Sequence, residues 1–194
     1  MARLLVLVAA GLVLGCPAFA HTGVGETVGF AHGFVHPVGG LDHLLTMVAV
    51  GLFAAQLGGR GLWLVPLAFV TMMGVGGALG MHGVPLPLTE LGIGLSIVAL
   101  GLAVAFGLDM PVAAAMAFVG FFAIFHGHAH GAEMPVSASG LEYGSGFVLA
   151  TVLLHACGIG LGLALRSLPR RRAEPVTQVA GAAMALAGIA VLSR

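Results

Sequence analysis

Long apolar stretches alternate with short polar or glycine- and proline-containing breaks along most of this chain. The apolar stretches cover residues 38–57, 62–81, 88–107, 111–130, 143–166 and 175–193. Because about 20 apolar residues suffice for a helix to cross the hydrocarbon core of a bilayer, each stretch is predicted to be a transmembrane helix. The breaks contain turn-forming sequences such as Gly58-Gly59-Arg60-Gly61. The pattern therefore predicts an all-α fold, a polytopic membrane bundle of six transmembrane helices.

The N-terminus has the pattern of a secretory signal peptide. A positive residue near the start is followed by the apolar run Leu4–Leu14 and then by Ala18-Phe19-Ala20, an A-x-A cleavage sequence. We predict a cleaved signal peptide over residues 1–20 and a six-helix transmembrane domain over residues 21–194. An alternative is lipidation at Cys16, because the residues that end there loosely resemble a lipobox.

Arginine placement predicts the orientation in the membrane. A cleaved signal peptide leaves the mature N-terminus in the periplasm, so the first, third and fifth of the predicted loops would be cytoplasmic. The first and fifth loops contain Arg60, Arg166 and Arg170–Arg172, whereas the second and fourth contain no lysine or arginine. This is the positive-inside pattern. We therefore expect a multi-pass protein of the bacterial inner membrane with a periplasmic N-terminus.

Composition agrees with a chain surrounded by a lipid bilayer. The sequence is 59% hydrophobic and 7% charged, whereas soluble domains carry roughly 25% charged residues. A formal net charge of zero argues against a nucleic-acid partner. The small-residue pairs Gly76/Gly80 and Gly158/Gly162 allow close helix approach, either inside one bundle or in a homo-oligomer.

Histidines supply the candidate chemistry. An ionisable side chain at the bilayer centre costs about 2.5–3.5 kcal/mol, so such residues are candidates for function, and imidazole is the most common metal ligand. With the predicted topology, every histidine lies at the outer face or within the membrane. The candidate metal ligands are His36, Asp42, His43, His126, His130, Glu133 and His155.

Spacing groups several of these residues. His126 and His130 are four residues apart and share a helix face, and Glu133 extends that stripe if the helix continues. His36 and His43 are seven apart, although a proline and two glycines between them can break the backbone.

The remaining candidates extend the set inward. Asp42 is expected either to ligate the metal or to orient a metal-ligating imidazole through a hydrogen bond. His155 lies about 12 residues into its span, or ~18 Å, near the middle of the bilayer. The isolated His82 and His128 are interpreted as surface or interfacial residues. Cys157 would be the only cysteine after cleavage, and nitrogen and oxygen ligands without thiolate suit nickel, cobalt, zinc or copper(II).

The motifs resemble those of a known family. The stretch His36-Pro-Val-Gly-Gly-Leu-Asp42-His43 is similar to the first-span signature of the HupE/UreJ family of nickel and cobalt permeases. Phe125-His126-Gly-His-Ala-His130-Gly-Ala-Glu133 resembles its fourth-span signature, and Leu154-His155-Ala-Cys-Gly fits its fifth. The resemblance implies a permease, not an enzyme, that takes up nickel or cobalt for urease or hydrogenase maturation. It also implies a role in transport for His36, Asp42, His43, His126 and Glu133.

The sequence also bears on the driving force of transport and on rival functions. The chain lacks the phosphate-binding sequence G-x-x-x-x-G-K-[ST], so ATP is not expected to drive transport. Passive uptake is expected, with proton antiport as the alternative. The ion is expected as a substrate, with no tightly bound cofactor. Rival functions are a metal-binding accessory protein or sensor that does not conduct, a membrane metalloenzyme, and a haem protein ligated by His43 and His126. The zinc-binding sequence H-E-x-x-H of metalloproteases is absent from the chain.

Overall fold

The computed structural model describes residues 29–134 and 139–193, and the described chain is all helical. Its helices are α2 (Phe30–Gly39), α3 (Leu41–Leu57), α4 (Gly61–Met81), α5 (Thr89–Ala105), α6 (Val112–Ala132), α7 (Gly140–Arg166) and α8 (Arg170–Leu192). Each of the six predicted apolar segments corresponds to one of the helices α3–α8. The predicted signal peptide, including the choice between cleavage and lipidation at Cys16, lies outside the described residues.

Length separates these helices into two groups. By length and composition α4, α6, α7 and α8 qualify as membrane spans, and α2 with α3 forms a bent pair that qualifies as a fifth. The α5 helix is apolar but has only 17 residues. At 1.5 Å per residue it extends about 25 Å, less than the roughly 30 Å of a typical hydrocarbon core. The described chain thus contains four candidate spans, or five with the bent pair, and α5 is shorter than the span predicted over residues 88–107.

A sharp bend divides the first predicted span. The axes of α2 and α3 differ by 82°, and the break lies at Gly40, whose backbone is extended (φ −90°, ψ 120°). Pro37, inside α2, removes a helical hydrogen-bond donor just before the break. The predicted helix over residues 38–57 therefore begins at Leu41, and the residues before it form a separate helix.

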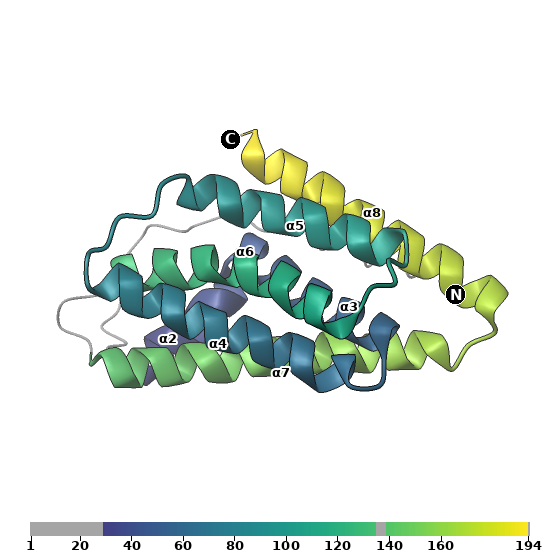
Figure 1. Ribbon diagram of the computed structural model, residues 1–194, viewed down its shortest axis with the longest axis horizontal. Coiled ribbons are helices and arrows are strands. Elements are labelled where there is room, and N and C mark those ends of the chain that lie inside the picture. The colour runs from purple at the N-terminus through teal and green to yellow at the C-terminus, as the bar shows by residue number, and fades with distance from the viewer. Residues whose placement is uncertain (1–28, 135–138, 194) are drawn as a thin grey trace.

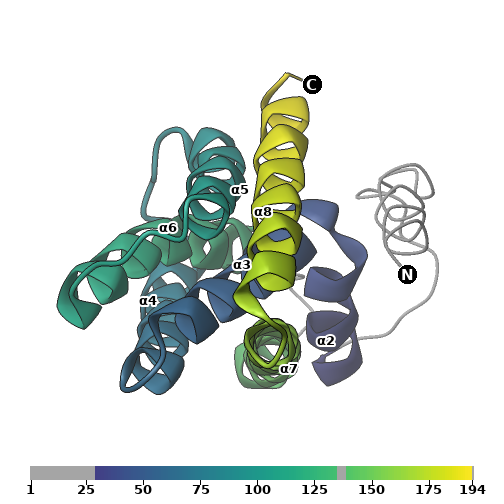
Figure 2. The ribbon, with the colours of Figure 1, turned by 90° about the vertical axis from the view of Figure 1, so that its right-hand side faces the viewer.

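The α3 helix lies at the centre of the bundle. It contacts every other described helix, and the most extensive remaining contacts are those between α4 and α6, between α5 and α8, and between α2 and α7. Figures 1 and 2 show these pairs arranged around α3. Its central position explains why Val50, Phe53 and Ala54 are fully buried.

Close contacts between helices depend on glycine. A Cβ atom added to Gly76 would clash with the carbonyl of Ile124 on α6, and one added to Gly158 would clash with the carbonyl of Val48 on α3. Both predicted small-residue pairs therefore pack within this single bundle. Their carbonyl contacts indicate backbone separations that a larger residue would not allow.

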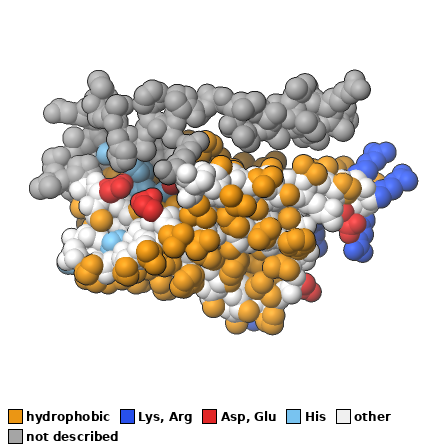
Figure 3. Space-filling view, turned by 90° about the horizontal axis from the view of Figure 1, so that it is seen from above, with side chains coloured by type: hydrophobic (Ala, Val, Ile, Leu, Met, Phe, Trp, Pro, Cys, Tyr) orange, Lys and Arg blue, Asp and Glu red, His pale blue; other side chains and the backbone are white. Residues whose placement is uncertain are grey.

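The outer surface is apolar, and the charged groups gather at its ends. Large hydrophobic residues such as Trp63 (75% exposed), Phe106 and Leu141 point outward. In Figure 3 apolar side chains cover most of the visible flank, histidines lie at one end and arginines at the other. A contiguous apolar surface of this extent fits a bilayer and not water.

Candidate metal site

Three helix ends meet at the histidine end of the bundle. His36 lies near the end of α2, Asp42 and His43 lie in the first turn of α3, and His126 and His130 lie near the end of α6. The bend at Gly40 brings the end of α2 and the start of α3 together here. Residues 83 or more positions apart in the sequence thus become neighbours.

The imidazole rings form one continuous group. The ring centroids of His43 and His130 are 4.3 Å apart, those of His36 and His130 are 4.6 Å apart, and those of His43 and His126 are 4.7 Å apart. The Nε2 atoms of His43 and His130 are 2.6 Å apart, within hydrogen-bond distance. We call His36, Asp42, His43, His126 and His130 the histidine cluster.

The outer edge of the cluster has the dimensions of a metal site. Ligand atoms of His36, His130 and Glu133 all lie within 4.8 Å of one another. Nitrogen and oxygen ligands lie about 2.0–2.2 Å from a transition-metal ion, so two of them on one tetrahedral ion are roughly 3.3 Å apart. Side-chain rotations would bring these three onto one ion. Glu133 follows the last residue of α6 and is exposed, and the His32 ring lies 6.0 Å from that of His36.

Asp42 is arranged to orient His43. Its Oδ1 lies 3.0 Å from Nδ1 of His43, so the Nδ1–H of the ring donates to the carboxylate. The Nε2 atom of His43 is then the acceptor in the contact with His130, and His130 donates through its own Nε2–H. This assignment leaves Nδ1 of His130 with a lone pair, and that atom is buried without a hydrogen-bond partner.

A hydrogen bond to Ser96, on α5, likewise determines which nitrogen of His126 carries the proton. Its hydroxyl donates to the carbonyl of Ile93 at 2.6 Å, so it accepts a hydrogen bond from Nε2–H of His126 at 2.8 Å. Nδ1 of His126 is left with a lone pair and is also buried without a partner. A lone pair is what a histidine needs to ligate a metal. In these tautomers His126 and His130 each keep a lone pair on Nδ1 that is available to a cation.

Sequence reasoning missed Ser96 and its neighbour Thr46. The two hydroxyl oxygens are 3.1 Å apart, and Thr46 also donates to the backbone carbonyl of Asp42. Both residues are fully buried. A single serine inside the apolar run of α5 was the available signal, but nothing in the sequence pairs it with a histidine 30 residues away.

Three further histidines are not part of the histidine cluster. His155 is buried within α7 and contacts Phe69 edge-on, with ring centroids 5.2 Å apart. The Nε2 atom of His128 lies 2.7 Å from the carbonyl of Val84. His82 is exposed at the end of α4. The structure thus places His82 at the surface, as the sequence indicates, whereas His128 is buried, against its interpretation as a surface residue.

The ring geometry disfavours haem ligation by His43 and His126. Their rings contact each other directly at an interplanar angle of 88°. A porphyrin held between two axial imidazoles would have to separate them. This pair, as arranged, leaves no room for that group.

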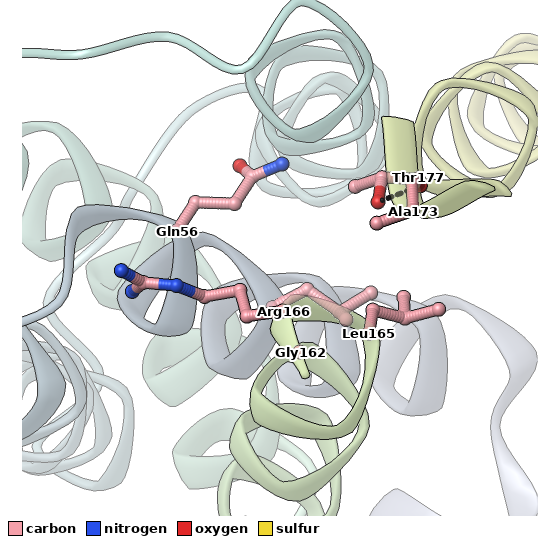
Figure 4. Close-up of a pocket in the computed structure, with 7 residues that line it drawn as sticks. Gln56, Gly162, Leu165, Arg166, Ala173 and Thr177 are labelled. Carbon is pink, nitrogen blue, oxygen red and sulfur yellow. Dashed lines mark hydrogen bonds between the residues drawn. The ribbon is translucent and has the colours of Figure 1, made fainter. Parts of the chain in front are cut away.

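A small pocket lies at the opposite end of the bundle. Gln56 from α3, Arg166 from α7 and Thr177 from α8 line it, with neighbouring apolar residues (Figure 4). Arg166 donates to the carbonyl of Ala55, and Gln56 donates to that of Val104. Histidine, cysteine and carboxylate side chains are absent from the residues lining it, and Arg166 would repel a cation. This pocket therefore lacks the features of a metal site.

The fold and site define a class of protein: a helical membrane protein with a buried imidazole–carboxylate cluster at one end of its bundle. The family model described as HupE / UreJ protein matches residues 7–191. "Protein HupE" of Rhizobium leguminosarum bv. viciae is 47% identical over 180 residues, which cover 92% of this chain and 93% of that relative. The chain therefore belongs to the HupE/UreJ family. No solved structure matches it.

Proposed function

We propose that this protein is a permease of the bacterial inner membrane that moves a divalent transition-metal ion inward, nickel first and cobalt second. The observation that carries the proposal is the histidine cluster, in which rings from three helices meet with two buried, unpartnered Nδ1 atoms. Membership of the HupE/UreJ family supports nickel or cobalt as the ion and urease or hydrogenase maturation as its destination.

The geometry suggests an order of events. His36, His130 and Glu133 would capture the ion at the exposed edge, where a carboxylate is in contact with water. His43 and His126 would receive it next, deeper in the bundle. The two carboxylates, Glu133 and Asp42, would offset the charge of the ion as it loses water.

Six crossings and a periplasmic N-terminus form part of the proposal. The α5 helix would cross as the shortest span, which a local thinning of the bilayer accommodates at modest cost. The arginines near the ends of α3, α7 and α8 would then face the cytoplasm. The histidine cluster would open toward the periplasm, where the ion enters.

Membrane potential is a sufficient driving force. Two positive charges that move inward gain ~4.6 kcal/mol per 100 mV. At 1.4 kcal/mol for each factor of ten, this supports roughly a thousandfold accumulation of the ion. Passive uptake therefore meets the demand for a trace metal, and proton antiport is the second candidate mechanism.

Uptake of radioactive nickel by cells that express the protein tests the proposal. We expect His36→Ala and Asp42→Asn to reduce uptake at least tenfold at equal protein levels. The matched controls His82→Ala and Asp109→Asn change exposed residues outside the cluster and should transport normally. Normal uptake by both cluster variants would refute the assignment.

Reconstitution separates a permease from a metal-binding accessory protein. Liposomes that contain only this chain should take up nickel when an inside-negative potential is imposed, and cobalt more slowly. Zinc serves as the third ion for comparison. Binding of nickel without flux into the liposomes would favour the accessory function.

A further inference from the structure

His155 is buried in the bundle without a hydrogen-bond partner. Its side chain is 2% exposed, and neither Nδ1 nor Nε2 makes a hydrogen bond. Leaving a buried polar group unpaired costs about 1–3 kcal/mol, so a histidine at this position requires an explanation. Apolar packing against Phe69 accounts for its ring but not for its nitrogens.

Other ligand-type side chains lie at the same helix interface. Thr151 precedes His155 by one turn on α7, and Met73 follows Phe69 by one turn on α4. Thr151 Oγ1 is 3.8 Å from the sulfur of Met73, just as the His155 ring contacts that of Phe69. All four side chains are buried. The facing surfaces of α4 and α7 thus place an imidazole, a hydroxyl and a thioether in one apolar region.

One aromatic ring contacts both this region and the histidine cluster. The Phe69 ring contacts both histidines, with its centroid 5.8 Å from that of His126 and 5.2 Å from that of His155. His155 is 15 residues beyond the start of α7, or about 22 Å along the helix. It therefore lies deeper in the bundle than the cluster.

We propose that His155, Met73 and Thr151 form a second, inner metal site, which receives the ion from the histidine cluster. This inference rests on the proposed function. The ligand class is a divalent ion that accepts nitrogen and sulfur, such as nickel or cobalt, and not magnesium or calcium. A site with no carboxylate holds a dication more weakly than the cluster does. A weaker inner site would release the ion onward.

Cobalt absorption tests ligation directly. In the purified full-length protein carrying Cys157→Ser, we expect His155→Cys to give a thiolate-to-cobalt charge-transfer band on addition of Co²⁺. Two controls should lack that band: Cys157→Ser alone, and His82→Cys in the same background, whose thiol would be exposed. Absence of the band in the His155→Cys variant would overturn the inner site.

Transport and stoichiometry distinguish a ligand from a packing residue. His155→Phe keeps an aromatic ring but no donor atom, and it should lose at least tenfold in nickel flux and bind one nickel ion fewer per chain than the wild type. His155→Cys keeps a donor and should exceed His155→Phe in flux. The reverse order, or wild-type flux in His155→Phe, would overturn the proposal.

The two proposals fail in different ways. If the wild-type chain carries no nickel, the proposed function fails, whereas the cobalt band of the His155→Cys variant still reports the inner site. If the wild type and His155→Phe transport equally, only the inner site fails.

Discussion

The Nε2 atoms of His43 and His130 lie 2.6 Å apart and join α3 to α6 at the histidine end of the bundle. His43 also contacts Asp42 through Nδ1 at 3.0 Å, so a single ring connects the carboxylate to the second histidine. The Asp42–His43–His130 chain determines which nitrogen of each ring carries a proton. The cluster is thereby arranged for ligation before any ion arrives.

Replacing His43 should disconnect this chain. We expect His43→Gln to weaken nickel binding about 10- to 100-fold, because groups that orient metal ligands typically contribute that much to affinity. Titration calorimetry of the purified protein measures the effect, and His82→Gln, at an exposed histidine, is the control. An unchanged affinity would show that His43 neither ligates the ion nor orients a ligand.

Ser96 should matter although it is not itself a candidate ligand. Ser96→Ala leaves Nε2 of His126 buried without an acceptor, so we expect the free energy of unfolding to fall by about 1–3 kcal/mol. The loss of the fixed tautomer should also weaken nickel binding. Ser145→Ala removes an exposed hydroxyl and should change neither quantity. Unfolding in detergent and nickel titration provide the two measurements, and wild-type values for both would contradict the tautomer assignment.

Because α4 packs closely against α6, two similar glycine-to-alanine substitutions should change the stability of the protein in different directions. A Cβ atom at Gly127 would clash with the carbonyl of Met73, so Gly127→Ala should destabilise the protein by about 1–3 kcal/mol. Gly74 has open space around it, and Gly74→Ala should be neutral or stabilise by up to about 1 kcal/mol through helix propensity. Unfolding by denaturant in detergent compares the two variants. Equal stability would indicate that the helices lie further apart than described.

The number of crossings between His82 and Arg171 can be counted by labelling. Three helices, α5, α6 and α7, separate these exposed residues. If all three cross, a cysteine at one position faces the periplasm and a cysteine at the other faces the cytoplasm. In a Cys157→Ser background, an impermeant maleimide should label intact spheroplasts of the His82→Cys variant and not those of the Arg171→Cys variant. The parent Cys157→Ser protein gives the baseline.

A different labelling pattern would change the topology. If both cysteines react with the reagent outside the cell, α5 does not cross and the chain has an odd number of spans. If only the Arg171→Cys variant reacts, the bundle is inverted relative to the proposed orientation.

Local sequence determined the helices well. A span requires a long apolar run because the bilayer offers no partners for the backbone, and that requirement acts within each segment alone. The starts of α4 and α5 consequently differ from prediction by a single residue. The family was also predictable, since its signatures are continuous stretches around His36, His43 and His130, and the match over residues 7–191 confirms it.

The arrangement of side chains was decided only by the tertiary structure. The 82° bend at Gly40, foreseen only as a break in the helix, carries His36 toward His130. The partnership of Ser96 with His126 joins helices that no periodicity relates. The contact of Phe69 with both His126 and His155 likewise depends on how α4 packs against α6 and α7. Apolar length and motif are properties of neighbouring residues, whereas the protonation and accessibility of an imidazole depend on which groups from distant helices surround it.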